Sequence, residues 1–310
     1  MQGVPPSSQN VSLYPRPTTG GFLKIKSYAK LNLFLDVINR RADGYHNIVS
    51  VMQSVDLYDE LEIKTTENPG FSFVTDSDEV PKDESNLVVK AAKIMISRYG
   101  IKEPFEIRLK KNIPVGAGLG GGSGNCASVL HGINVFFNLN IPHDELLGIG
   151  RSLGADVPFC LTGGTCLAEG IGEKLTPLDP HPDCLIVIAY PNTQVSTKEI
   201  FASLAPPDFS LGEKNLEHIC SGLSNNELTK VALSLYNVFT DLTVKKVPRA
   251  GQLLTVFRNG GAIGESMTGT GSAVFGYFTK SETAQSTAED LKRLGSVFIT
   301  RPVKGINVRR

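Results

Sequence analysis

Apolar and polar residues alternate along residues 22–37, FLKIKSYAKLNLFLDV, as they do in a strand with one buried face. Lys30 and Asn32 fall on the polar face, where a solvent-facing lysine is common. A turn built on Asp-Gly at residues 43–44 follows, and residues 48–64 form a second strand-like stretch. The pattern therefore predicts two long strands in succession. The apolar face of the first carries Leu23, Ile25, Ala29, Leu31, Leu33, Leu35 and Val37.

Helical spacing of apolar residues appears first at residues 87–95. Asp83 or Ser85 can cap this expected helix, and Gly100 can end it. Further elements expected in the first half are a strand at 105–109, a helix behind a glycine-rich loop and a shorter helix at 143–153, with Pro142 at its start and Gly154 just past its end.

The second half begins with a continuous apolar run at residues 184–189, which is typical of a buried central strand. Helices are expected near 226–239, 250–258 and 282–294, with a strand and glycine-rich turn at 267–276 and a last strand at 296–301. TPLDPHP interrupts the pattern near residues 177–182. We therefore expect a flexible tail at 1–22, a first domain at 23–180 and a second domain at 181–310.

The loop PVGAGLGGGSGN, residues 114–125, holds six glycines between Gly116 and Gly124, more than a flexible turn requires. The loop contains the G-x-G-x-x-G pattern of dinucleotide-binding proteins, which directly follows a strand in those proteins. Here KKNIPV separates the pattern from the preceding strand, and no strand ending in an acidic residue follows the helix. Dinucleotide binding is therefore weakly supported. Gly122 stands where a Walker loop needs lysine. Successive glycines let backbone N–H groups converge on an anion, and Ser123 with the helix start adds to this, so the loop predicts a phosphate cradle.

Composition and charge argue against several classes of protein. The 310 residues suffice for two domains, and 31 basic against 31 acidic residues argue against nucleic-acid binding driven by bulk charge. Residues 1–22 lack the apolar core of a secretory signal, and the longest apolar run, 184–190, is too short to span a membrane. Five cysteines without a CxxC pair suggest reduced thiols in a cytosol, and five scattered histidines suggest no metal cluster.

The glycine loop resembles the phosphate loop of the GHMP kinases. SYAKLNLFLDV (27–37) resembles the first motif of this family, and MTGTGSAVFG (267–276) resembles its third, in the same order. The resemblance covers roughly residues 23–303. It implies an α+β fold of two domains, the first like domain 2 of ribosomal protein S5 and the second ferredoxin-like, with ATP and the substrate meeting in the cleft between them.

Within this family, RADGYHNI and GADVPFC resemble the branch that phosphorylates a hydroxyl of a cytidine-diphosphate-linked methylerythritol in isoprenoid precursor synthesis. Other GHMP kinases, such as homoserine or mevalonate kinases, and a nucleotide sensor without turnover remain alternatives. DGYH and Phe201 argue against a homoserine or mevalonate kinase. The presence of both Lys30 and Asp156 argues against a sensor without turnover.

The resemblance also implies roles for individual residues. Asp156 matches the catalytic base, Lys30 its partner toward the acceptor hydroxyl, and Asn32 a substrate-binding residue. Without the other motifs, Asp156 would be an ordinary turn residue after a helix. The expected phosphate loop consists of Pro114, Gly116, Gly118, Leu119, Gly120, Gly121, Gly122 and Ser123.

The remaining implied sites surround the loop. They are a cytidine site of Tyr45, His46, Thr197 and Phe201, an adenine region at Asn86 and Leu87, and a C-terminal glycine turn of Thr268, Gly269 and Gly271. The implied phosphoryl donor is ATP, with Mg²⁺ carried mostly by the nucleotide because no cluster of carboxylates suggests a protein-held metal. YNVFTD (236–241) departs from the family's pattern and is expected only to pack, and Gly124 stands where relatives often have serine.

Overall fold

The computed structural model describes residues 21–205 and 209–305, and the backbone of residues 307–309. Residues 1–20, most of the expected tail, lie outside this range. Phe22, the last residue of that expected tail, already begins strand β1 (Phe22–Arg40).

The first sheet is built on β1 and β2 (His46–Thr65), a long antiparallel pair joined by the expected turn at 43–44. Its main strand order within the described residues is β12-β1-β2-β4-β3. The smaller strands extend this frame, because β5 pairs with β2 and β6, and β8 pairs with β1. The added strands are β3 (Phe71–Thr75), β4 (Phe105–Lys110), β5 (Thr165–Gly170), β6 (Lys174–Pro177), β8 (Tyr236–Asn237) and β12 (Asn307–Arg309).

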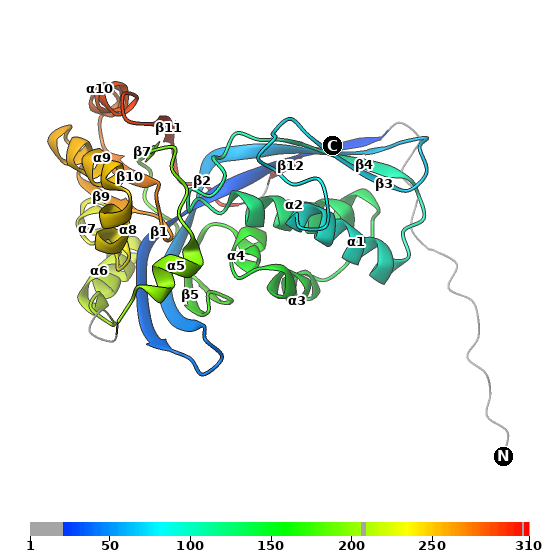
Figure 1. Ribbon diagram of the computed structural model, residues 1–310, viewed down its shortest axis with the longest axis horizontal. Helices are drawn as coiled ribbons and strands as arrows, with labels where there is room; N and C mark the ends of the chain where they lie inside the picture. The colour runs from blue at the N-terminus through cyan, green and yellow to red at the C-terminus, as the bar shows by residue number, and fades with distance from the viewer. Residues whose placement is uncertain (1–20, 206–208, 306, 310) are drawn as a thin grey trace, which may run out of the picture.

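Four helices gather on one side of the first sheet (Figure 1). They bury one cluster of apolar side chains against β1, β2 and β4, with Leu130 and Ile133 of the second helix fully buried. These helices are α1 (Leu87–Tyr99), α2 (Gly121–Phe136), α3 (His143–Leu153) and α4 (Val157–Thr162).

The second sheet is antiparallel, with strand order β11-β7-β10-β9. Two helices, α9 and α10, alternate with these strands along the chain in the β-α-β-β-α-β sequence of a ferredoxin-like domain. The elements are β7 (Leu185–Tyr190), α5 (Thr197–Ala202), α6 (Glu213–Ser224), α7 (Leu228–Leu233), α8 (Thr240–Lys246), α9 (Pro248–Asn259), β9 (Gly264–Met267), β10 (Val274–Phe278), α10 (Ser281–Leu291) and β11 (Ser296–Thr300).

Both faces of the second sheet are buried, which explains the continuous apolar run in β7. Ile186 and Ile188 point into a cluster shared with β1 and β2, whereas Val187 and Ala189 point into a cluster shared with α9 and α10. The two halves of the chain therefore share one apolar interface. The sheets change between β6, which ends at Pro177, and β7, so we keep a domain division near residue 180 as a proposal.

Strand β1 departs from the expected half-buried pattern, because both of its faces are buried from Ala29 to Val37. Its register against β2 shifts between Tyr28 and Ala29 and twice more further along. The strand thus leaves the first core at Ile25, crosses the shared interface at Leu31 and ends in the second core. The expectation of a solvent-facing polar face is wrong here, because the glycine loop and the second half of the chain cover it.

Three local expectations also need correction. Asn86, not Asp83 or Ser85, caps α1, and its Oδ1 accepts a hydrogen bond from Val88 N at 2.8 Å. The helix expected near 226–239 ends at Leu233, because Tyr236 and Asn237 pair with β1 instead. Residues 296–300 are not the last strand, since β12 returns to the first sheet and pairs with β1.

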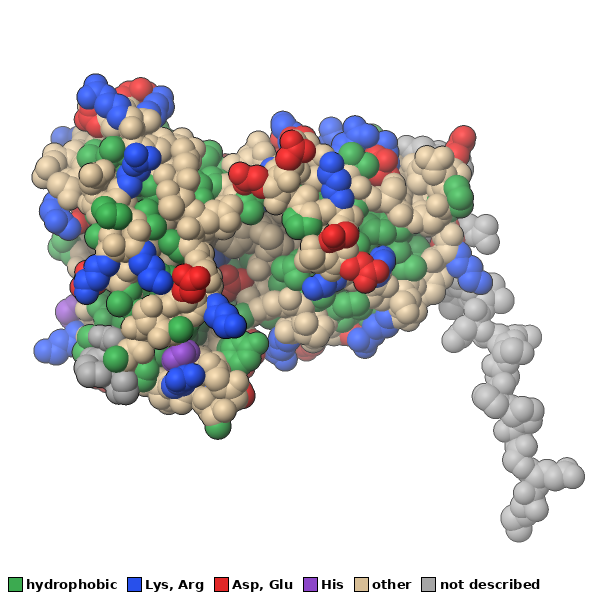
Figure 2. Space-filling model, viewed as in Figure 1, with side chains coloured by type: hydrophobic (Ala, Val, Ile, Leu, Met, Phe, Trp, Pro, Cys, Tyr) green, Lys and Arg blue, Asp and Glu red, His purple; other side chains and the backbone are tan. Residues whose placement is uncertain are grey.

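The surface carries both signs of charge spread over the visible face (Figure 2), in keeping with the equal numbers of acidic and basic residues. All five cysteines are free thiols, as expected for reduced cysteines. Within the described ranges, none of the helices has the length and apolar character needed to cross a membrane.

Candidate active site

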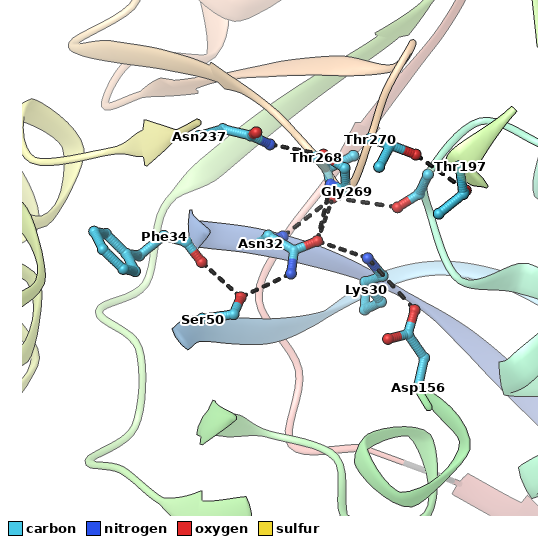
Figure 3. Close-up of polar contacts among 11 residues, drawn as sticks. Lys30, Asn32, Phe34, Ser50, Asp156, Thr197, Asn237, Thr268, Gly269 and Thr270 are labelled. Carbon is cyan, nitrogen blue, oxygen red and sulfur yellow. Dashed lines mark hydrogen bonds and ion pairs between the residues drawn. The ribbon is translucent and has the colours of Figure 1, made fainter. Parts of the chain in front are cut away.

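Lys30 and Asp156, expected as a catalytic pair, face each other in the structure (Figure 3). Lys30 Nζ lies 3.7 Å from Asp156 Oδ2 and donates a hydrogen bond of 2.6 Å to Asn32 Oδ1. The Lys30 side chain is only 5% exposed, whereas that of Asp156 is 36% exposed. The pair therefore presents a carboxylate to the solvent side and holds the ammonium behind it.

Asp156 stands at the N-cap position of the six-residue helix α4, immediately before Val157 and Pro158. An aspartate at this position commonly accepts a hydrogen bond from its own helix, but the Asp156 side chain makes no such capping bond. Its backbone carbonyl instead accepts from Cys160 N at 3.0 Å. The buried apolar side chains of α4 fix the backbone, and the carboxylate is left to face Lys30.

Asn32 is the hub between the two halves of the site. Its Oδ1 accepts hydrogen bonds from Lys30 Nζ at 2.6 Å and from Gly269 N at 2.9 Å, and lies 3.3 Å from Thr268 Oγ1. Its Nδ2 donates to Ser50 Oγ at 2.8 Å. Because the carbonyl oxygen already faces three donors, what Asn32 can offer a substrate is its remaining amide N–H.

The glycine loop lies against β1 and leads directly into α2. Lys30 N donates to Leu119 O at 3.0 Å, and the buried Leu119 side chain anchors the loop in the core. Gly116, Gly118 and Gly120 have φ values of +70°, +82° and +70°, which favour glycine. The α2 helix starts at Gly121, so its free N–H groups face the loop.

Close packing also requires glycine at two of these positions. A Cβ at position 118 would collide with the backbone oxygen of Thr268, and one at position 120 would lie 2.8 Å from Lys30 Cγ. The loop is thus pressed between Lys30 and the C-terminal glycine turn.

A pocket of about 350 Å³ opens over the loop. Pro114, Gly122 and Ser123 line it, and so do Asn86 and Leu87, which were expected near adenine. Because Asn86 uses its carbonyl to cap α1 and its Nδ2 to donate to Pro81 O at 2.7 Å, its side chain is held in a single orientation at the pocket wall. All the expected phosphate-loop residues line this pocket, namely Pro114, Gly116, Gly118, Leu119, Gly120, Gly121, Gly122 and Ser123.

A buried ionic network beside the pocket was not anticipated. Asp59 is fully buried, forms an ion pair with Lys111 and accepts hydrogen bonds from Ile113 N at 2.8 Å and Asn125 Nδ2 at 2.8 Å. It therefore ties the segment just before the loop to helix α2. The sequence signal was the lysine in KKNIP directly before the loop, but its partner lies on another strand.

The C-terminal glycine turn closes the site from the second half of the chain. Thr268 Oγ1 lies 3.3 Å from Gly118 O, and Gly271 N donates to Thr268 O at 3.0 Å. Thr197, expected in the substrate site, reaches the turn through a 3.1 Å hydrogen bond between its hydroxyl and that of Thr270. Residues expected in separate motifs therefore meet at one place.

The hairpin between β1 and β2, which carries Tyr45 and His46, lies beside α5, which carries Phe201 (Figure 1). The His46 and Phe201 rings lie 5.3 Å apart, and Phe201 also packs against Phe239 at 4.6 Å. Tyr45 is 63% exposed. Burial, with a smaller contribution from Arg40, lowers the pKa of His46, which favours a neutral ring at neutral pH.

Comparisons with known proteins agree with this arrangement. Residues 86–164 match the GHMP kinases N terminal domain, and residues 216–297 match the GHMP kinases C terminal domain. The chain is 43% identical over 272 residues to a 4-diphosphocytidyl-2-C-methyl-D-erythritol kinase of Caldicellulosiruptor bescii, covering 87% of this chain and 94% of that protein. It is 40% identical over 291 residues to a kinase of the same name from Clostridium perfringens, covering 92% and 100%.

Solved structures lead to the same family. A crystal structure of 4-(cytidine 5'-diphospho)-2C-methyl-D-erythritol kinase matches with a TM-score of 0.78 and 30% identity, covering 91% of this chain and all of that one. A homoserine kinase from Cytophaga hutchinsonii shares the fold, with a TM-score of 0.74 at 22% identity, covering 96% and 100%.

The fold, the glycine loop and these matches make the chain a member of the GHMP kinases. This confirms the α+β, two-domain fold expected from the sequence motifs. Within that family it belongs with the 4-diphosphocytidyl-2-C-methyl-D-erythritol kinases.

Proposed function

We propose that this chain transfers the γ-phosphoryl group of ATP to the 2-hydroxyl of 4-diphosphocytidyl-2-C-methyl-D-erythritol in the methylerythritol phosphate route to isoprenoid precursors. The observation that carries this proposal is the Lys30–Asp156 pair at 3.7 Å, placed beside a glycine loop that opens a helix. Relatives of this name cover nearly the whole chain.

The loop from Gly116 to Ser123 would hold the ATP phosphates with its backbone N–H groups. The positive end of α2 favours negative charge at the same place, and the pocket extends to Asn86 and Leu87, where we place the adenine. Since phosphoryl transfer depends mostly on positioning and charge stabilisation, a rigid cradle is an important contribution.

The acceptor would lie next to Asp156. Its hydroxyl oxygen forms a bond to the γ-phosphorus while the bond from that phosphorus to the β,γ-bridging oxygen breaks, which leaves ADP. The hydroxyl proton goes to the Asp156 carboxylate. The Lys30 ammonium, held by Asn32, would stabilise the negative charge on the oxygens around it.

Divalent metal would enter with the nucleotide. Across residues 21–205 and 209–305, no three histidine, cysteine, aspartate or glutamate side chains group closely enough to hold a metal ion. We therefore propose that Mg²⁺ is bound by ATP phosphate oxygens, where it would offset their charge.

The cytidine base would bind at the hairpin aromatic cluster, defined as Tyr45, His46 and Phe201. Tyr45 and Phe201 could cover the faces of the ring while His46 hydrogen-bonds its polar edge, and Thr197 would approach from α5. We further propose a cytosolic location, since the cysteines are all free, and small-molecule partners rather than nucleic acid.

An ADP-release assay with a panel of alcohols tests the proposal. ADP should appear with 4-diphosphocytidyl-2-C-methyl-D-erythritol and not with homoserine or mevalonate. Release with either of those instead would identify another GHMP kinase activity. ATP binding with no ADP from any alcohol would indicate a nucleotide sensor and would refute the proposed activity.

A further inference from the structure

Asn237 makes more polar contacts than its expected packing role requires. It lies in β8 and is 6% exposed. Its Nδ2 donates to Met267 O and to Gly269 O, each at 2.8 Å, and its Oδ1 accepts from Phe239 N at 2.9 Å. Both amide hydrogens are therefore used on carbonyls that flank Thr268, and Figure 3 shows the Asn237 amide directed toward this turn.

The backbone of the same segment is joined to β1. Asn237 pairs in parallel with Leu35, and Val238 N donates to Leu35 O at 3.0 Å. Strand β1 carries Lys30 and Asn32, so Asn237 connects the strand of the catalytic lysine to the C-terminal glycine turn.

The C-terminal glycine turn also positions the Asn32 side chain. Gly269 N donates to Asn32 Oδ1 at 2.9 Å, and Lys30 Nζ donates to the same oxygen at 2.6 Å. A rotation of the turn would remove one donor from this oxygen and change where it holds the ammonium. We propose that Asn237 is a positioning residue for phosphoryl transfer, acting through Gly269 and Asn32 on Lys30. This inference rests on the proposed kinase function.

A purely packing role would be served by an apolar side chain. Burying an amide costs free energy unless its hydrogen bonds are made. The hydrogen bonds of the Asn237 side chain all go to backbone groups around the site. The sequence could not reveal this, because the two-residue strand depends on pairing with a distant segment.

The direct test is Asn237→Asp, which keeps the size and the acceptor for Phe239 N but turns both donors into an oxygen facing two carbonyls. We expect kcat with the cytidyl substrate to fall by about 10- to 100-fold. Asn215→Asp is the matched control. The Asn215 Nδ2 also donates a hydrogen bond to a backbone carbonyl, that of Ser234, at 3.1 Å, but this carbonyl is not part of the C-terminal glycine turn. This variant should keep wild-type kcat.

A cycle with Asn32→Ala separates positioning from general damage. If Asn237 acts through Asn32, adding Asn237→Asp to Asn32→Ala should lower kcat by less than about twofold further. A full additional loss, or wild-type kcat in Asn237→Asp itself, would overturn the proposal. If the Asp variant folds poorly, Asn237→Ser replaces it in the cycle. The serine hydroxyl is shorter and has a single proton to donate, so kcat of this variant should fall about tenfold.

Amide hydrogen exchange at Gly269 provides a readout that does not depend on turnover. The amide should exchange faster in Asn237→Asp than in the wild type or in Asn215→Asp. Unchanged exchange would overturn the proposed hold on the turn. Absence of ADP release by the wild-type protein would instead refute the proposed activity, while the exchange result still decides the role of Asn237 in the turn.

Discussion

The Lys30 ammonium stands between two oxygens, 2.6 Å from Asn32 Oδ1 and 3.7 Å from Asp156 Oδ2. The shorter contact comes from the same strand, β1, and the longer one comes from Asp156 at the start of helix α4. Asn32 thus holds the Lys30 ammonium on one side, and the looser contact to Asp156 lies on the more exposed side of the pair.

Asp156→Asn should lower kcat by about 10²- to 10⁴-fold, because the amide keeps the shape but cannot take a proton. ATP affinity, measured by calorimetry, should change little, since the loop pocket does not include this residue. A smaller loss would indicate that the carboxylate acts mainly by positioning. Wild-type turnover would show that Asp156 is not needed.

Gly120→Ala should weaken ATP binding and lower kcat, each by about tenfold or more, because φ is +70° and the new Cβ would meet Lys30 Cγ at 2.8 Å. Gly148→Ala is a suitable control. Gly148 lies within α3, and a Cβ added there would have no neighbouring atom within 4 Å. It should keep activity and gain about 1 kcal/mol of stability. Equal behaviour of the two variants in calorimetry and turnover would contradict the cradle.

Tyr45→Ala should raise KM for the cytidyl substrate by about 5- to 150-fold, since base stacking is worth about 1–3 kcal/mol and 1.4 kcal/mol is tenfold. KM for ATP and kcat should hardly change. Because Tyr45 is 63% exposed, the melting temperature of the variant should match that of the wild type. An unchanged KM would argue against base stacking on Tyr45.

Phe201→Ala should affect both stability and substrate binding, whereas Tyr45→Ala should affect substrate binding alone. Phe201 packs on Phe239 at 4.6 Å, so truncation should lower stability, though by less than the about 3–5 kcal/mol of a fully buried phenylalanine. KM for the cytidyl substrate should still rise more than KM for ATP. Equal damage to both KM values with lowered stability would assign Phe201 to the core alone.

His181 gives a prediction for pH-dependent stability. Its Nδ1–H donates to Pro182 O at 2.7 Å, so Nε2 is the acceptor for the Tyr277 hydroxyl at 3.0 Å. Burial lowers the pKa of His181 to about 4, so the ring is neutral in the fold. The unfolded chain, with a pKa near 6.5, takes up the proton first as pH falls.

Stability should therefore be lost as pH falls from about 6.5 toward about 4. In His181→Gln, which cannot take a proton, urea unfolding should show a weaker decline over the same range. Parallel declines in the two proteins would assign the acid sensitivity to other groups.

Most of the long elements could be predicted from the sequence because their periodicity extends over several turns or strand repeats, but the 12-residue helix α6 was missed. Strand β8, with two residues, and β12 could not, since both depend on pairing with β1 far along the chain. Helix α4 was also missed, because six residues show no clear period.

For the site, the motifs predicted that Lys30 and Asp156 act together, and the structure places their side chains 3.7 Å apart. They did not identify Asn237 or the Asp59–Lys111 pair. The importance of these residues comes from burial and from partners on other elements, which a sequence reveals only after the fold is known. The same reason explains why the polar face of β1 was wrongly expected to face solvent.

The contact between Lys30 and Gly120 has an evolutionary consequence. A side chain at position 120 would compete for space with the lysine stem, so the strand motif and the loop motif cannot drift independently. A loop taken from another family member should therefore be tolerated beside Lys30 only when it keeps glycine at position 120.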